Sequence, residues 1–352
     1  MQPRILIIYT GGTIGMIHDP VTKALVPFDF DHLMENVPKV KMLDYHIDNI
    51  QFAKPIDSSN MRPEFWQQIS KNIADNYERY DGFVVLHGTD TMAYTASALS
   101  FMLQGLTKPV IITGSQLPIG EVRTDGEENL ITALQIAAAR ADDGRPMVQE
   151  VAILFENYLW RGCRSTKRSA DHFNAFRSNN YPFLAHIGLG ITYDIDALDR
   201  RVDKELRVYN ELDTNVLCID LFPGLSEKTL RHQLSTPGIK GLVLRTFGAG
   251  NGPTVEWFVD AIHEACRKGI IILNVTQCVN GAVSPERYAT GDILAATGVI
   301  SGRDITFEAA ITKMMHLFGQ NISHDEVCRR LETSLVGEMT LTESNFHTQD
   351  IS

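Results

Sequence analysis

The feature that most constrains the fold is a regular alternation between short runs of β-branched residues and longer segments with helical periodicity. Such alternation is typical of β-α-β units built around a parallel sheet. The strands and helices expected in the first half are, in chain order, 4–9, 63–80, 82–86, 91–103, 109–113, 127–141 and 151–155. The helix at 91–103 is predicted to pack on the sheet through a single stripe of Met92, Ala96, Leu99, Met102 and Leu103.

The length of 352 residues exceeds the size at which one hydrophobic core usually stops growing, so two domains are expected. From about 193 to 215 the pattern breaks into a charged stretch that reads as a connector. The alternation then resumes over 216–221, 230–234, 241–245, 255–267 and 270–275, with helices at 307–318 and 325–331. We therefore predict an α/β fold of two doubly wound, mostly parallel-sheet domains. The larger N-terminal domain spans 1–195, the connector 196–214 and the smaller C-terminal domain 215–352.

Composition narrows the function classes. Acidic residues outnumber basic ones, 43 to 32, which argues against nucleic acid as a partner. The sequence contains no run of 18 apolar residues, the length that could span a membrane. The apolar run at 5–9 is too short for a secretory signal. Five widely spaced cysteines without a CxxC pair favour free thiols in a reducing compartment, so a cytoplasmic location is expected. No His/Cys spacing matches a zinc site, and the sequence predicts no metal and no cofactor.

Polar clusters follow the expected strands of the first domain. They are Thr10–Gly15, His87–Thr91 and Gly114–Gln116, and a fourth, Asp57-Ser58-Ser59, precedes the first long helix. Ligands of open α/β sheets bind beyond the carboxyl ends of the strands, and these ends share one edge when strands are parallel. We expect the clusters to line one ligand site.

Thr13 follows Gly11 and Gly12 in the first of these turns. The turn matches neither GxGxxG nor GxxxxGK[ST], so nucleotide binding is not indicated. A hydroxyl behind two glycines can be presented at an exposed bend, as a nucleophile elbow presents serine. The alternative is that Thr13 caps a helix or donates to a neighbouring carbonyl.

The other candidates also have structural alternatives. Thr89 and Asp90 stand where helix N-caps belong, although a helix N-terminus also suits a substrate carboxylate and Asp90 a substrate ammonium. The Asp57–Ser59 segment could complete a site for an amino acid or simply form a turn. Lys167 lies in a basic run where most lysines are solvated. If it were buried beside a threonine hydroxyl, it could act as a base.

Taken together, these motifs resemble the bacterial type I (cytoplasmic) L-asparaginase family. The resemblance covers nearly the whole chain in the same order. It rests on the segments 9–16, 57–59, 87–94, 114–116, 161–167, 244–248 and 274–278.

The resemblance implies hydrolysis of L-asparagine to L-aspartate and ammonia. Thr13 would be the nucleophile, and Thr89, Asp90 and Lys167 would form a Thr–Lys–Asp relay that moves protons. Asp57, Ser58 and Ser59, with Thr89 and Asp90, would hold the α-amino and α-carboxyl groups of the substrate. The oxyanion would need preorganised donors, such as backbone N–H groups near Thr89.

The resemblance also implies a homodimer or a dimer of dimers, in which a neighbouring protomer completes the site. Asn251 and Tyr288 are candidates for that contribution, with a turn residue and a packing aromatic as the alternatives. Family members often carry a tyrosine about ten residues after the first threonine, but Leu25 stands near that position here. Because leucine cannot transfer a proton, another group must activate Thr13.

Some cytoplasmic members bind asparagine at a second, regulatory site. Arg245, Thr276, Gln277 and Cys278, with Thr166, resemble the residues that form it. A lone arginine at a strand end and a buried cysteine are equally consistent with a structural role.

Two other functions remain open at this point. One is a related amidase acting on glutamine or, as in the transfer-RNA amidotransferase subunit of this superfamily, on a glutamyl group. The start of this chain on the catalytic strand counts against that subunit. The other is an amino-acid sensor without catalysis, although a pure binder would not need both threonines and the lysine.

Overall fold

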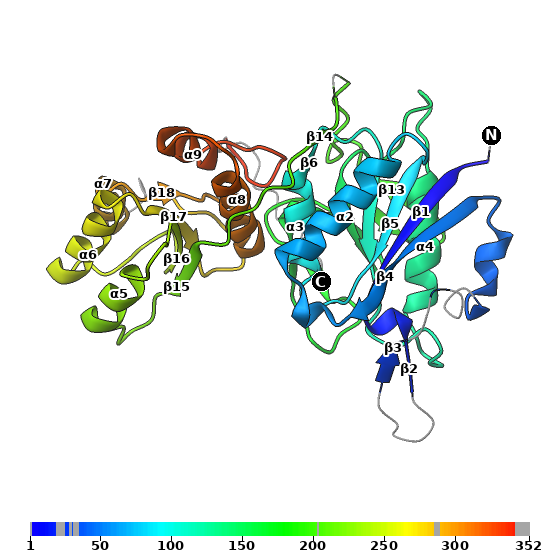
Figure 1. Ribbon diagram of the computed structural model, residues 1–352, viewed down its shortest axis with the longest axis horizontal. Coiled ribbons are helices and arrows are strands. Elements are labelled where there is room, and N and C mark those ends of the chain that lie inside the picture. The colour runs from blue at the N-terminus through cyan, green and yellow to red at the C-terminus, as the bar shows by residue number, and fades with distance from the viewer. Residues whose placement is uncertain are drawn as a thin grey trace. The chain divides into compact units, whose positions relative to one another are not determined.

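The computed structural model of the protein describes residues 2–18, 25–27, 30, 35–202, 204–284 and 289–341. The chain divides into two compact units. The first comprises Met1–Ser178 and Pro182–Asn210, and the second Asn179–Tyr181 and Glu211–Ser352. Each unit is built around its own sheet (Figure 1). The change of unit at Asn210 lies within the predicted connector, because residues 196–210 belong to the first unit.

The first unit contains an eight-stranded sheet in the order β13-β12-β9-β8-β7-β5-β1-β4. The strands from β4 to β8 are parallel to their neighbours, whereas β9, β12 and β13 extend the sheet in antiparallel fashion. The predicted mostly parallel sheet is therefore confirmed. The strands are β1 Arg4–Gly11, β4 His46–Ile56, β5 Gly82–Leu86, β7 Val110–Thr113, β8 Val151–Phe155, β9 Tyr158–Arg161, β12 Ala185–Ile187 and β13 Ile191–Tyr193.

Three long helices connect the parallel strands: α2 (Pro63–Asn76), α3 (Met92–Met102) and α4 (Gly126–Ala138). Pro63 opens α2, where its missing N–H is harmless. In α3 every residue except Tyr94 is buried, so the predicted single apolar stripe is wrong. The cause is that α3 packs against α2, β8 and the segment after β9 at once, so almost none of its surface meets solvent.

The edge strand β4 was not predicted from the sequence. Apart from the buried Phe52, its residues are exposed or partly buried and include Asp48, Asn49 and Lys54, so it lacks the apolar run of a central strand. It runs parallel to β1, and this pairing places the following Asp57–Ser59 turn beside the first glycine turn.

Short antiparallel pairs hold the segments around the main sheet. Residues after β1 form β2 (Met16–His18), which pairs with β3 (Leu25–Pro27). The segment after β9 forms β10 (Ser165–Lys167), which pairs with β11 (Phe176–Ser178). A third pair joins β6 (Leu103–Gln104) to β14 (Arg207–Val208).

The second unit has a four-stranded parallel sheet in the order β15-β16-β17-β18. Leu242 and Leu244 of β16 share one core with α5 and α6. The alternate residue Gly241 faces α8, since a Cβ there would collide with Met314 and Phe318. Helices therefore cover both faces, as predicted. The elements are β15 Val216–Asp220, α5 Glu227–Leu234, β16 Gly241–Thr246, α6 Glu256–Arg267, β17 Ile271–Thr276, α7 Ala289–Ala296, β18 Ile300–Ser301, α8 Phe307–Gly319 and α9 His324–Leu331.

In the second unit, a fully buried ion pair joins α8 to the segment after α9. Lys313 Nζ of α8 lies 2.8 Å from Glu338 Oε1, and both side chains have 0% exposure. Lys313 also donates to the carbonyls of Leu331 and Thr333, while Glu338 accepts the N–H groups of Leu335 and Val336. Because both charges are saturated with hydrogen bonds, the segment after α9 is fixed to α8.

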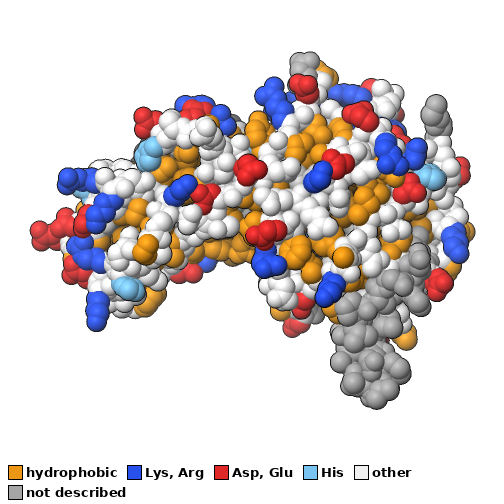
Figure 2. Space-filling view, viewed as in Figure 1, with side chains coloured by type: hydrophobic (Ala, Val, Ile, Leu, Met, Phe, Trp, Pro, Cys, Tyr) orange, Lys and Arg blue, Asp and Glu red, His pale blue; other side chains and the backbone are white. Residues whose placement is uncertain are grey.

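On the face of the molecule shown in Figure 2, acidic and basic side chains are interspersed. That face therefore offers no extended surface of a single charge. Within the residues that the structure describes, no helix is both long and apolar enough to cross a bilayer.

Candidate active site

Four turns meet at the carboxyl edge of the first unit's parallel strands. Gly12 has φ 92° and ψ 172°, and a Cβ there would collide with the backbone of Gly88. A Cβ on Gly88 would in turn meet Ser58, and one on Gly114 would meet the carbonyl of His87. Glycine thus allows the turns after β1, β4, β5 and β7 to touch, which brings the predicted clusters into one site.

Lys167 reaches this edge from β10. Its Nζ donates to Thr89 Oγ1 over 2.8 Å and to Asp90 Oδ1 over 2.7 Å. The Lys167 side chain is 19% exposed, so the alternative of a solvated lysine is wrong, whereas the Asp90 side chain is 62% exposed. The carboxylate of Asp90 can therefore contact a ligand while it remains paired with Lys167.

Gln116 orients the hydroxyl of Thr89. Its Nε2 donates to the carbonyl of His172 over 2.9 Å, which turns its Oε1 towards Thr89. Thr89 Oγ1 donates to that Oε1 over 3.3 Å. Because an ammonium has only donors, Thr89 accepts from Lys167 and gives its own proton to Gln116. The sequence motif contained Gln116 but no signal for this role.

The Asp57–Ser59 turn lies beside Thr89 and Asp90. Asp57 Oδ1 accepts the N–H and the hydroxyl of Ser59, both over 2.9 Å, so Asp57 also has the turn-forming role that was its alternative. Ser58 Oγ accepts the N–H of Asp90 over 3.2 Å. The turn therefore offers one carboxylate and two hydroxyls next to the residues that Lys167 contacts.

Thr13 is the first residue of a short 3-10 helix, Thr13–Gly15, and is partly exposed. Gly12 precedes it at the N-cap and forms no side-chain cap. Among the described residues, the hydroxyl of Thr13 has no hydrogen-bond partner. The capping and carbonyl-bonding alternatives are thus not seen within the described part of the chain.

A buried chain of hydrogen bonds supports the turn that carries Thr89. Trp66 Nε1 donates to Thr95 Oγ1 over 2.9 Å, and Thr95 Oγ1 lies 2.8 Å from His87 Nε2. Because a carbonyl oxygen can only accept, His87 Nδ1 carries the ring proton and donates to the carbonyl of Gly88 over 2.6 Å, and His87 Nε2 of the neutral ring accepts the Thr95 proton. Burial lowers the pKa of His87 to about 4, so the ring is neutral near pH 7. Sequence reasoning missed this chain.

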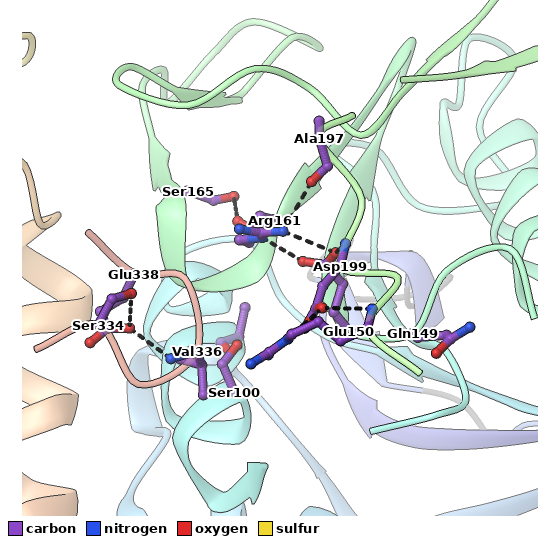
Figure 3. A network of polar contacts seen from close by, with 12 residues as sticks. Ser100, Gln149, Glu150, Arg161, Ser165, Ala197, Asp199, Ser334, Val336 and Glu338 are labelled. Carbon is purple, nitrogen blue, oxygen red and sulfur yellow. Dashed lines mark hydrogen bonds and ion pairs between the residues drawn. The ribbon is translucent and has the colours of Figure 1, made fainter. Parts of the chain in front are cut away.

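The segment that carries Lys167 is held by a second polar network (Figure 3). Arg161, at the end of β9, pairs with Glu150 over 2.6 Å and donates to the carbonyl of Ala197. Glu150 also accepts the N–H of Asp199. Ser165 Oγ donates to the carbonyl of Arg161 over 2.7 Å, two residues before Lys167. Arg161 thereby fixes the start of the path from β9 to β10.

The residues predicted for a regulatory site lie in both units. Thr166 is on β10 of the first unit, and the others lie at the carboxyl edge of the second unit's sheet. There Thr276 Oγ1 donates to the carbonyl of Gly248 and Gln277 Nε2 to those of Leu221 and Arg245. Each has a structural role, and Cys278 is exposed rather than buried.

Arg245 itself keeps capacity for a ligand. Its Nη1 lies 3.0 Å from Asp220 Oδ1, and its guanidinium stands 4.9 Å from the centre of the Phe307 ring. In the part of the chain that the structure describes, Arg245 Nε is buried without a hydrogen-bond partner. The guanidinium thus has a donor left over.

The remaining candidates are only partly described. Asn251 exchanges two backbone hydrogen bonds with Phe247, which agrees with its alternative as a turn residue. Leu25 lies on β3, but its side chain falls outside the described residues, as does the whole of Tyr288. The described residues contain no group of three His, Cys, Asp or Glu side chains that could hold a metal.

Comparison with known proteins covers nearly the whole chain. The model of the family "Asparaginase, N-terminal" matches residues 4–198, and that of "Glutaminase/Asparaginase C-terminal domain" matches 215–331. L-asparaginase 1 of Escherichia coli is 41% identical over 97% of this chain and 99% of its own. A 60 kDa lysophospholipase of Mus musculus is 38% identical over 99% of this chain and 64% of its own. The crystal structure of L-asparaginase I from Vibrio cholerae matches with a TM-score of 0.88 at 40% identity, over 97% of this chain and all of that one.

Proposed function

The chain belongs to the asparaginase family, and from that premise we propose that it hydrolyses the side-chain amide of L-asparagine with Thr13 as nucleophile. The observation that carries the proposal is the placement of Lys167 Nζ, within 2.8 Å of both Thr89 Oγ1 and Asp90 Oδ1. A site that only bound an amino acid would not need a lysine held against a threonine hydroxyl.

The reaction has two steps. Thr13 Oγ attacks the amide carbon, the C–N bond breaks, and ammonia leaves an ester on Thr13. Water then attacks the ester carbon, which releases L-aspartate and restores the hydroxyl. The Thr13 proton ends on the departing ammonia, and a proton of the attacking water returns to Thr13 Oγ. Thr89 and Lys167 pass these protons on, and Asp90 stabilises Lys167 when it carries one. The N–H of Thr89 donates to no residue that the structure describes, so it is available to stabilise the oxyanion.

Substrate recognition uses the groups around the Asp57–Ser59 turn. The second carboxylate oxygen of Asp57 and the exposed carboxylate of Asp90 suit the α-ammonium of an amino acid. Ser58 supplies a hydroxyl donor, because its Oγ accepts from Asp90 and keeps its own proton, whereas Ser59 donates its proton to Asp57 and orients that carboxylate. The α-carboxylate would also face the N-terminus of α3. The site thus holds the charged end of the substrate and leaves the side-chain amide near the threonines.

Replacement of Thr13 tests the proposal directly. Thr13→Val keeps the shape but removes the hydroxyl, so ammonia release should fall by more than about a thousandfold while asparagine still binds. Thr13→Ser, which keeps a hydroxyl, is the matched control and should retain measurable turnover. Near-normal activity in Thr13→Val would exclude Thr13 as the nucleophile.

The same coupled ammonia assay separates the other candidate functions. Ammonia from glutamine in preference to asparagine would indicate a related amidase with a different substrate. Binding of asparagine without ammonia from either amide would indicate a sensor.

Leu25 cannot be the base that activates Thr13, because a leucine side chain cannot accept or donate a proton. Another group must serve as that base. Tyr288 is one hydroxyl that could serve. Tyr288→Phe should then lower kcat for acylation while asparagine binding is kept. An unchanged kcat would exclude Tyr288 as the activating group.

We further propose a homodimer or dimer of dimers in which Asn251 and Tyr288 complete a neighbouring site. A mixture of Thr13→Val protein and a variant altered at Asn251 tests this. If sites are shared, mixed oligomers should regain activity that neither parent has. Light scattering would show a monomer if the assembly is absent.

Regulation by asparagine is proposed at Arg245, with Thr166, Thr276, Gln277 and Cys278. The position of Arg245 at the carboxyl edge of the second unit's parallel sheet supports it, since ligands of open α/β sheets bind at that edge. Asparagine saturation should be sigmoidal, and Arg245→Met should make it hyperbolic. A hyperbolic curve in the unmodified protein would remove the regulatory site.

A cytoplasmic location is proposed from the cysteines. Cys163, Cys218, Cys266, Cys278 and Cys328 are all free thiols, as a reducing compartment allows. Cell fractionation would test it, and recovery outside the cytoplasmic fraction would contradict it.

A further inference from the structure

Thr91 occupies the N-cap position of α3, yet its hydroxyl does not cap the helix. Its side chain donates instead to the carbonyl of Ser58 over 2.7 Å. A threonine cap typically contributes about 1 kcal/mol to helix stability. The Thr91 hydroxyl does not make that contribution, because it bonds to Ser58 instead. The stability of α3 therefore does not explain the bond to Ser58.

A second bond runs between the same two turns, and Ser58 is again the acceptor. The N–H of Asp90 donates to Ser58 Oγ over 3.2 Å. Gly88, one residue before Thr89, lets Ser58 approach, since any Cβ there would collide with the Ser58 side chain. Ser58 is 4% exposed, so water does not compete freely for these bonds. Two hydrogen bonds and a close contact therefore hold the turns at a fixed separation.

The Asp57–Ser59 turn and Thr89 have different tasks in the proposed reaction. The Asp57–Ser59 turn holds the α-groups together with Asp90, whereas Thr89 and Lys167 act on the side-chain amide. The separation between the Asp57–Ser59 turn and Thr89 must match the number of carbons between the α-carbon and the amide. Asparagine and glutamine differ there by one methylene, and a pocket can discriminate against one methylene by about 10–200-fold if it is rigid.

We propose that Thr91 is a specificity-determining positioning residue, whose bond to Ser58 fixes the turn separation that selects asparagine over glutamine. The inference rests on the proposed amidase function and adds the substrate selectivity of that site. Thr91 contacts the backbone of Ser58 and acts on the substrate through it.

The test is the ratio of kcat/KM for asparagine to kcat/KM for glutamine, measured by ammonia release. In Thr91→Val, which keeps the shape and loses the hydroxyl, the ratio should fall by up to about tenfold. The cause should be a higher KM for asparagine with kcat less affected. Thr91→Ser restores the hydroxyl and should keep the ratio within about twofold of the original.

Thr236→Val is the matched control. Its hydroxyl also donates to a backbone carbonyl over 2.7 Å, but it lies on the exposed surface of the second unit. It should leave the ratio unchanged. If Thr91→Val does not fold, as judged by circular dichroism and thermal unfolding, Thr91→Ala takes its place.

The outcomes separate the inference from the function on which it rests. An unchanged ratio in a folded Thr91→Val or Thr91→Ala protein overturns the role of Thr91. So does an unmodified protein that turns over both amides equally well. Absence of ammonia from both amides in the unmodified protein overturns the amidase function itself.

Discussion

The two units carry parallel sheets whose carboxyl edges are used differently. At the edge of the first unit, side chains from distant segments bond to one another, as Lys167 does to Thr89 and Asp90. At the edge of the second unit, Thr276 and Gln277 bond to backbone carbonyls of the neighbouring loops. Both edges suit ligand binding by topology. The difference shows that the topology of a sheet does not by itself make an active site. Catalysis also requires polar side chains that can contact a ligand, rather than side chains whose donors are used by backbone carbonyls of the loops.

Glycine geometry gives the largest expected contrast between the units. Gly12 and Gly269 have similar φ values, 92° and 88°, but a Cβ on Gly12 would strike Gly88, whereas one on Gly269 would meet nothing within 4 Å. Gly12→Ala should therefore abolish ammonia release and destabilise the first unit by several kcal/mol, on the order of 3 or more, from strain and collision together.

The matched variant Gly269→Ala has only the backbone strain. It should cost about 1 kcal/mol in the free energy of unfolding and leave kcat unchanged. Urea unfolding and the ammonia assay measure both. Equal effects from the two glycines would show that the contact between turns is not what the first edge needs.

Lysine–carboxylate pairs give the next contrast. Lys313→Met should destabilise the second unit by about 3–5 kcal/mol, because Glu338 would stay buried without its partner. Lys167→Met should lower kcat by about 10²–10⁴-fold. It should change unfolding by no more than about 1 kcal/mol, because the Asp90 carboxylate is largely hydrated.

Chemical denaturation with the ammonia assay distinguishes the two lysines. Lys313→Met/Glu338→Gln, which removes both charges, should recover part of the lost stability. A large loss of stability in Lys167→Met would mean that the first unit also uses its pair for folding.

The smallest expected contrast is between two buried histidines, His87 and His316, which are found among the described residues of the first and second unit respectively. Burial lowers the pKa of His87, in the first unit, and of His316, in the second, to about 4. The unfolded chain binds these protons near the ordinary pKa of about 6.5. Above about pH 6.5 neither histidine lowers the free energy of unfolding. As the pH drops from about 6.5 to about 4, each lowers it by about 2–3 kcal/mol, because the unfolded chain takes up a proton that the folded chain does not.

Histidine-to-glutamine variants measure this pH dependence. His87→Gln should flatten the fall of stability between about pH 6.5 and 4, and so should His316→Gln in the second unit. The exposed His232, changed in the same way, is the control. An unchanged slope in His87→Gln would show that the ring takes up its proton without unfolding.

Much of the first edge could be predicted from the sequence. The rule for parallel strands placed the glycine turn, His87–Thr91 and Gly114–Gln116 at one edge, because each follows an apolar run. The place of Lys167 came from the resemblance alone. Its burial depends on β9, β10 and the Arg161–Glu150 pair, and no periodicity in the sequence indicates those contacts.

Other features gave no usable sequence signal. Strand β4 is an edge strand with polar residues on it, so its pattern resembles a loop. The chain from Trp66 through Thr95 to His87 joins residues that are 8 to 29 positions apart, and each looks like an ordinary helix or turn residue. Side chains that bond across elements are specified by the packed fold rather than by local composition.

The buried pair of Lys313 and Glu338 has a consequence for biosynthesis. During translation, Lys313 of α8 leaves the ribosome before the glutamate that neutralises it. Until residue 338 is available, a second unit that closed around Lys313 would enclose an uncompensated charge. Domains fold in order as they leave the ribosome, so the first unit can fold early. The second unit can complete its folding only after the segment that contains Glu338 has left the ribosome. A nascent chain that stalls before Glu338 should therefore display the second unit as a substrate for chaperones and proteases.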